Sequence, residues 1–159
     1  MVGLVNGVIE VFKPIAGSKS ISLKLDSAVE SVHVTVDIEM IKSVVRNLIS
    51  NAIKFSHKDT AVVVHVRVQE VADENRTEAG NDKEVLVTVS DSGCGIKKED
   101  QEKLLNEATH FTTFGTDSEE GSGLGLLLCK DFVSKNHGRL WFTSEEGVGS
   151  NFNFTIPLK

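Results

Sequence analysis

The sequence has few of the features that would place it in a membrane or on nucleic acid. Acidic residues outnumber basic ones, 23 to 17, and the net charge is −6. This balance argues against nucleic acid or an anionic membrane surface as a partner. No apolar run approaches the about 18 residues of a spanning helix, and the first residues lack the basic start of a signal peptide. We therefore expect a cytoplasmic chain without direct membrane contact, and a membrane anchor elsewhere in a parent protein stays open.

Cysteine is also scarce, with Cys94 and Cys129 the two examples. Neither belongs to a CxxC pair or has a histidine at metal-binding spacing, which excludes a cysteine-rich metal site. Two isolated thiols are typical of a reducing cytosol. Cys129 lies in an apolar helical stretch and is expected in the core, whereas Cys94 lies between two glycines.

No internal repeat, low-complexity tract or second domain is evident, so residues 1–159 are expected to form a single domain with its own core. Apolar periodicity predicts one helix that begins near residue 4 and ends near residues 14–17, and a second over residues 38–54. Residues 97–107 are expected to form a short charged helix, and residues 125–135 a helix that follows a glycine-rich stretch. Alternating patterns predict strands over residues 21–25, 32–36 and 84–91, and an apolar, partly continuous pattern predicts one over residues 61–68. Residues 140–143 and 151–156 are expected to form the last strands. Residues 69–83 are polar, and we interpret them as a solvated loop, with a regulatory contact as the alternative.

The most informative stretch is residues 47–56, which continues a predicted helix whose candidate N-cap is Asp37. Asn47 and Asn51 share one helix face at a spacing of four, and Lys54 joins them three residues later. A carboxamide oxygen is a hard neutral ligand suited to Mg²⁺, and a lysine can contact phosphate as a point charge. The alternative is a polar rim on an amphipathic helix.

A second motif ends the strand predicted before Asp91, where Gly93 and Gly95 follow the aspartate. A carboxylate at a strand end can accept a hydrogen bond from an exocyclic amine such as that of adenine. The glycines let the backbone approach a ligand closely. The alternative is an ordinary turn that leaves a strand.

The third motif places Gly121, Gly123 and Gly125 just before a helix predicted to end near Lys135. Free backbone N–H groups and the positive end of the helix dipole form an anion site. No strand leads into these glycines, so they are not a dinucleotide fingerprint. The segment 17–20 lacks the earlier glycine of a Walker A loop.

In this order the three motifs resemble the ATP-binding catalytic domain of two-component sensor histidine kinases, the Bergerat fold shared with gyrase, Hsp90 and MutL. Residues 111–114 resemble the family's F box, and residues 108–120 its ATP lid. Residues 147–157 resemble its closing GxGTxFxFxLP strand, with Ser150 in place of threonine. The resemblance extends from about residue 4 to Pro157. It implies a two-layer α/β sandwich, a mixed, mostly antiparallel sheet with helices on one face.

The resemblance also implies a role for each motif. Asn51 would ligate Mg²⁺, with Asn47 assisting, Lys54 would contact phosphate, and Asp91 would recognise the adenine amine of ATP. Further ATP contacts are implied for the adenine loop, the F box, the lid glycines and the last strand: Gly93, Gly95, Ile96, Phe111, Phe114, Gly121, Gly123, Leu124, Gly125 and Ser150.

The activity implied is transfer of the γ-phosphoryl group of ATP to a histidine on a separate dimerisation domain, with a response regulator downstream. Family members that hydrolyse ATP have a glutamate base at the position of Asn47, and an amide cannot accept that proton. The five histidines, His33, His57, His65, His110 and His137, lack the family's acceptor context. Two alternatives stay open: a nucleotide-binding regulatory module without transfer, and a serine kinase of the anti-sigma type.

Overall fold

The computed structural model describes residues 1–71, 82–104, 115–116 and 124–158. Within them, a five-stranded sheet has the order β1-β2-β3-β5-β4. Its strands are β1 (Ser22–Ser27), β2 (Ala61–Glu70), β3 (Lys83–Asp91), β4 (Leu140–Glu145) and β5 (Gly149–Leu158). β1 and β2 pair in parallel, and the other pairs are antiparallel. The expected mixed, mostly antiparallel sheet is therefore confirmed.

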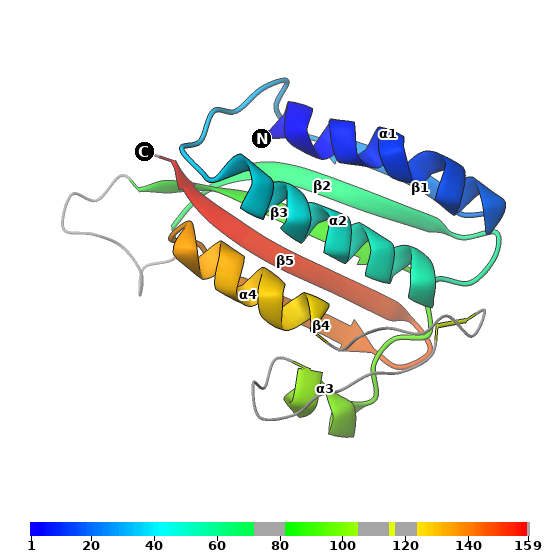
Figure 1. Cartoon of the computed structure of the whole chain (residues 1–159). Coiled ribbons are helices and arrows are strands. Elements are labelled where there is room, and N and C mark those ends of the chain that lie inside the picture. The colour runs from blue at the N-terminus through cyan, green and yellow to red at the C-terminus, as the bar shows by residue number, and fades with distance from the viewer. Residues whose placement is uncertain (72–81, 105–114, 117–123, 159) are drawn as a thin grey trace.

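Three helices cover one face of this sheet (Figure 1). They are α1 (Val2–Ser18), α2 (Ile38–Phe55) and α4 (Gly125–Lys135), and α2 lies between the other two. A short helix, α3 (Lys98–Leu104), lies apart from this layer. The Asp37 side chain accepts a hydrogen bond of 3.0 Å from the Met40 amide, which confirms the N-cap of α2.

The core forms where apolar side chains on alternate strand positions meet the helices. Val64 pairs with Val89 and Val87 pairs with Phe154 across three neighbouring strands, and all four are fully buried. Full burial of side chains of this size contributes roughly 1.5–3 kcal/mol each. From α2, the helix layer supplies a continuous buried stripe: Ile41, Val44, Val45, Leu48, Ile49, Ala52 and Ile53.

Residues 32–36 do not form the predicted strand and have no regular secondary structure. Val32, Val34 and Val36 pack against the core on alternate positions, so the alternation records side-chain packing without a backbone ladder. The first helix continues through Pro14 and ends at Ser18, close to the end expected near residues 14–17. Its last turn places the fully buried Ala16 in the core.

The ends of α2 and β3 meet at one end of the molecule. An isolated bridge joins Ser56 to Gly93, just beyond these two elements. The segment that follows β3 therefore runs beside the C-terminal turn of α2, which brings the first two sequence motifs together. Among the described residues, no helix is both long enough and apolar enough to cross a bilayer.

Candidate functional site

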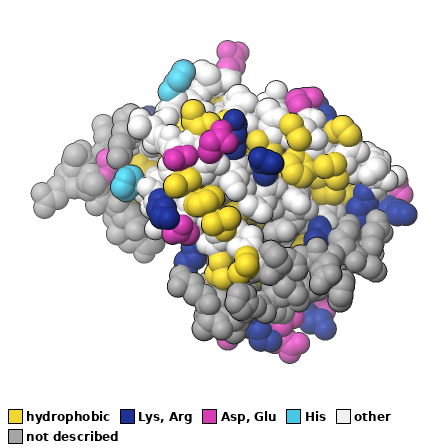
Figure 2. Space-filling model, in the orientation of Figure 1, with side chains coloured by type: hydrophobic (Ala, Val, Ile, Leu, Met, Phe, Trp, Pro, Cys, Tyr) yellow, Lys and Arg dark blue, Asp and Glu magenta, His cyan; other side chains and the backbone are white. Residues whose placement is uncertain are grey.

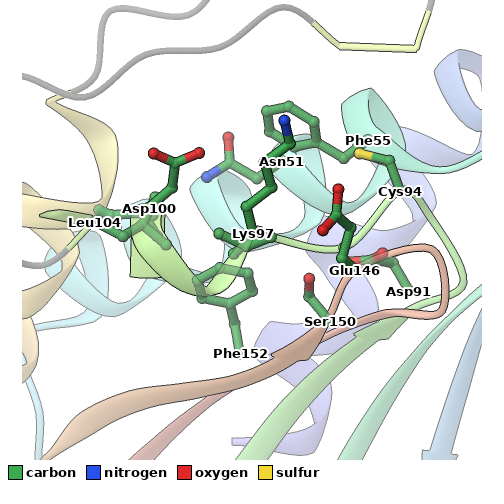
Figure 3. A pocket seen from close by; sticks show the side chains of 13 residues that line it. Asn51, Phe55, Asp91, Cys94, Lys97, Asp100, Leu104, Glu146, Ser150 and Phe152 are labelled. Carbon is green, nitrogen blue, oxygen red and sulfur yellow. The ribbon is translucent and has the colours of Figure 1, made fainter. Parts of the chain in front are cut away.

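A cavity of about 230 Å³ opens between the last turn of α2 and the end of β3. Its walls are mainly apolar, with a polar rim: Phe55, Ile96, Leu104, Leu126 and Phe152 form the walls, and Asn51, Asp91, Cys94, Gly95, Lys97, Asp100, Glu146 and Ser150 complete the lining. Figure 3 shows Asn51 and Phe55 on one side of the cavity and Ser150 and Phe152 on the opposite side. Sites for whole drug-sized ligands measure roughly 300–1,000 Å³, so this cavity is smaller than such a site.

Asn51 is the member of the asparagine motif that lines the cavity. Asn47 lies one turn earlier on α2, and its amide nitrogen donates to the Ser43 carbonyl at 2.9 Å. A Cβ added to Gly125 would lie 3.1 Å from the Asn47 side-chain oxygen. The start of α4 therefore packs closely on this amide, and the first and third sequence motifs are neighbours in space.

Lys54 lies at the last turn of α2 but does not line the cavity. Its ammonium nitrogen lies 5.0 Å from the centre of the Phe55 ring. On the face drawn in Figure 2, the described Lys and Arg side chains are interspersed with Asp and Glu. The described residues on this face therefore form no broad positive surface.

Asp91 is the last residue of β3 and is mostly buried beside the cavity. Burial raises the pKa of its carboxyl group to about 6, against the opposing effect of hydrogen bonds from the backbone of Gly93 and Ser150. The Gly93 amide donates to the carboxylate at 2.9 Å. At neutral pH the carboxylate is mainly ionised, and it is a strong acceptor for an amine donor.

The two glycines after Asp91 are required by the protein's own backbone. A Cβ on Gly93 would lie 2.1 Å from the Phe55 carbonyl oxygen, and one on Gly95 would lie 2.0 Å from that of Glu145. Gly95 also has a φ of 65°, which favours glycine. These glycines let the loop pass between α2 and the turn that joins β4 to β5.

Hydrogen bonds hold the loop in this position. The Cys94 amide donates to the Phe55 carbonyl at 3.1 Å, and the Cys94 carbonyl accepts from the Gly147 amide at 2.8 Å. The Ile96 amide donates to the Ser144 hydroxyl at 2.8 Å, and that hydroxyl also lies 2.8 Å from the Ser150 hydroxyl. Ile96 and Ser150, both predicted site residues, thus share one hydrogen-bonded group.

The structure brings together Asn51, Asp91, Gly95, Ile96 and Ser150 around the cavity. Leu124 and Gly125 lie at the start of α4, outside its lining. Phe111, Phe114, Gly121 and Gly123 lie outside the described residues. Lining residues that the motifs did not identify are Phe55, Lys97, Asp100, Leu104, Leu126, Glu146 and Phe152. Phe55 could have been identified from the sequence, because it lies four residues after Asn51 and so shares its helix face.

The two thiols differ in environment. Cys94 lines the cavity, and burial raises the pKa of its thiol. Cys129 is fully buried, as expected, and burial raises the pKa of its thiol to about 12. Thiolate reactivity should therefore be low at Cys129 and higher at Cys94.

Among the described residues, no three His, Cys, Asp or Glu side chains gather as a metal cluster. Mg²⁺ is commonly bound by one or two protein ligands together with substrate phosphates and water. The Asn51 amide at the cavity wall fits such a ligand.

The chain matches the model of one protein family over most of its length. Residues 36–159 match the model of the histidine kinase-, DNA gyrase B- and HSP90-like ATPase family. The chain belongs to this family. The match includes α2 and everything after it, and thus every residue that lines the cavity.

Similar curated proteins are named as a sensory kinase and a sensor protein. The chain is 34% identical over 156 residues to the adaptive-response sensory kinase SasA of Synechococcus sp. (strain JA-2-3B'a(2-13)), and this match covers 98% of the chain. It is also 34% identical over 157 residues to the sensor protein EvgS of Escherichia coli (strain K12). The chain spans 38% of the length of SasA and 12% of that of EvgS.

Solved structures of histidine kinases share the fold. The nucleotide-free catalytic domain of histidine kinase ThkA superposes with a TM-score of 0.70 at 25% identity, covering 99% of this chain and 91% of that domain. Full-length ShkA in complex with AMPPNP superposes with a TM-score of 0.74 at 22% identity, covering 97% of this chain and 29% of ShkA. The likeness to ThkA covers both chains almost completely, so this chain is similar to a whole histidine kinase catalytic domain.

Proposed function

We propose that this chain is the ATP-binding catalytic domain of a sensor histidine kinase. It transfers the γ-phosphoryl group of ATP to a histidine on a separate dimerisation domain of the parent protein, which then passes it to a response regulator. The observation that supports this most directly is the Asp91 carboxylate beside an apolar cavity. Together they suit a flat base that presents an amine.

The charges around the cavity indicate which end of ATP it receives. Asp91, Asp100 and Glu146 contribute three carboxylates to the lining, and Lys97 contributes one ammonium. Carboxylates repel phosphate and accept hydrogen bonds from amines, so we assign the cavity to adenine. The phosphates then extend toward Asn51, Asn47 and Lys54, and toward the start of α4.

Each residue near the phosphates has a distinct part in the proposal. The Asn51 oxygen would ligate Mg²⁺, which neutralises charge on the phosphates when it is bound. Lys54 contacts phosphate as a point charge, and the N-terminus of α4 at Gly125 offers backbone N–H groups. Catalysis then consists mainly of positioning and charge neutralisation.

The transfer step needs no protein base. A neutral imidazole nitrogen has a lone pair that attacks the γ-phosphorus, and the bond from that phosphorus to the bridging oxygen of ADP breaks in line. Asn47 lies beside the start of α4 with an amide that cannot accept a proton from water. This supports phosphotransfer over hydrolysis. A cytoplasmic location is part of the proposal, and the free thiols of Cys94 and Cys129 support it.

The test is calorimetry of ATP with the isolated chain, followed by a transfer assay with the parent's dimerisation domain added separately. We expect ATP binding, very slow phosphate release, and acid-labile ³²P on the added domain alone. Binding without transfer would favour a regulatory module, and acid-stable label on a serine would favour the anti-sigma type of kinase. Absence of ATP binding would refute the proposal.

A further inference from the structure

The C-terminal end of α2 is tied to three other parts of the chain. Helices end with carbonyl groups that have no partner within the helix. At this end, the side chain of Lys19, the residue after α1, donates to the carbonyls of Ile53 at 3.1 Å and Lys54 at 2.8 Å. These carbonyls lie 34 and 35 residues from Lys19 in the sequence, so this contact exists only in the tertiary structure.

Two further segments use the neighbouring carbonyls. The amide and hydroxyl of Thr116 donate to the Lys54 carbonyl at 3.1 and 3.2 Å, and the same hydroxyl lies 2.7 Å from the Ser56 carbonyl. The Phe55 carbonyl accepts from the Cys94 amide at 3.1 Å. Four consecutive carbonyls therefore join the end of α1, the loop after β3 and residue 116 at one junction.

Lys19 is well suited to this place. The residue is 7% exposed, and burying an ammonium group is costly unless it has strong partners. The C-terminal end of a helix has a partial negative charge, which favours a cation there. The backbone beside Lys19 is fixed as well, because the Ser20 carbonyl accepts from the Asp59 amide at 2.9 Å. Ser20 itself turns the chain with a φ of 58°.

We propose that Lys19 and Thr116 are positioning residues of the nucleotide site. They act through the last turn of α2, whose side chains include Asn51, Lys54 and Phe55. By holding its carbonyls they fix the turn relative to the loop of Cys94, and so set the distance between the adenine cavity and the phosphate contacts. This inference rests on the proposed function, because it assigns the junction a part in ATP binding.

The first test needs no nucleotide. Lys19→Met keeps an apolar stem of similar length and removes the donors, and Lys13→Met is the matched control, since Lys13 lies exposed on α1 and pairs with Glu10. Amide hydrogen exchange measured by NMR should rise about 10-fold or more at Cys94 and Thr116 in Lys19→Met, because hydrogen bonds to a charged group are lost. Lys13→Met should exchange like wild type.

Two results would overturn the inference at this stage. One is unchanged exchange at Cys94 and Thr116. The other is an equal rise at the core amide of Val87, which would make Lys19 a contributor to overall stability only. If Lys19→Met does not fold, Thr116→Val provides the test, because it removes the Thr116 hydroxyl with little change in side-chain shape. Exchange at Cys94 should then rise in Thr116→Val and stay at the wild-type rate in Thr116→Ser.

The second test measures ATP affinity by calorimetry. Lys19→Met and Thr116→Val should each bind ATP several-fold more weakly than wild type, while Lys13→Met and Thr116→Ser should match it. Faster exchange with wild-type affinity would show that the junction does not position the site. If the wild-type chain itself bound no ATP, the proposed function would fail, and the exchange data would still report whether the junction holds the loop.

Discussion

The pKa of Asp91 makes a quantitative prediction about ATP binding. Burial raises that pKa to about 6, from a usual value of 3.8. If the carboxylate accepts a hydrogen bond from the adenine amine, ATP affinity should follow its ionised fraction. That fraction falls from about nine-tenths at pH 7 to about one-tenth at pH 5, so this group alone should weaken ATP binding about 10-fold.

The measurement is calorimetric titration of ATP between pH 5 and pH 7 with wild type and Asp91→Asn. The phosphates of ATP also titrate near pH 6, and the variant supplies that background because it retains every phosphate contact. At pH 7 the variant should bind about 10- to 100-fold more weakly, since a hydrogen bond to a charged group is worth about 1.5–3 kcal/mol. GTP has a carbonyl in place of the amine and should bind poorly to wild type.

A stability measurement checks the same pKa without nucleotide. A carboxyl group whose pKa is raised by folding stabilises the folded state while it is protonated, and this contribution is lost as the pH rises. Relative to Asp91→Asn, the free energy of unfolding of wild type should therefore decrease as the pH rises from about 4 to about 6.

The binding measurements decide the adenine assignment. It would be refuted if wild type and Asp91→Asn showed the same pH dependence of ATP binding, or if GTP bound to wild type as tightly as ATP.

Three further predictions concern other parts of the site. Asn51→Ala should abolish Mg²⁺-dependent transfer in the reconstituted assay and leave metal-free ATP binding intact; near-wild-type transfer would exclude the metal role. Timed alkylation with peptide mass spectrometry should modify Cys94 before Cys129, and Mg-ATP should slow the reaction at Cys94; equal rates with and without nucleotide would place that thiol away from the ligand. Gly95→Ala should lower the free energy of unfolding, measured in urea, by about 1–3 kcal/mol, because the added Cβ would overlap the Glu145 carbonyl. The control Gly7→Ala should raise it by about 0.5–1 kcal/mol, because Gly7 lies in α1 and an added Cβ would meet nothing within 4 Å. The reverse order of stabilities would contradict the packing of the loop.

Local patterns were sufficient to predict most of the fold and part of the site. The spacing of apolar residues after Asp37 predicted α2 and its cap, a partly continuous apolar run predicted β2, and alternation predicted β3, because these patterns are properties of single elements. The same patterns placed Asn51 on a helix and Asp91 at a strand end. Alternation over residues 32–36 predicted a strand wrongly, since alternate burial does not require a paired strand.

The remainder of the site depends on which elements become neighbours. Phe152 from β5, Leu126 from α4 and Leu104 from α3 line one cavity with Asn51, although none of them has a local pattern that marks it as a site residue. The same is true of Glu146, which reaches the cavity from the turn between β4 and β5. Their shared position follows from strand order and helix packing, which involve contacts distant in sequence.

The sequence by itself determined the chemistry of the molecule: two amides and a lysine on one helix, a carboxylate at a strand end, and glycines in a loop. The tertiary structure decided the pKa values of these groups and the residues that they contact. Burial cannot be predicted from the spacing of residues in the sequence, and it raises the pKa of Asp91 to about 6. Close backbone approach explained Gly93, whose Cβ would overlap the Phe55 carbonyl. Only the folded chain brings Lys19 to the end of α2, because a hydrogen bond between residues 34 positions apart requires the ends of α1 and α2 to pack together.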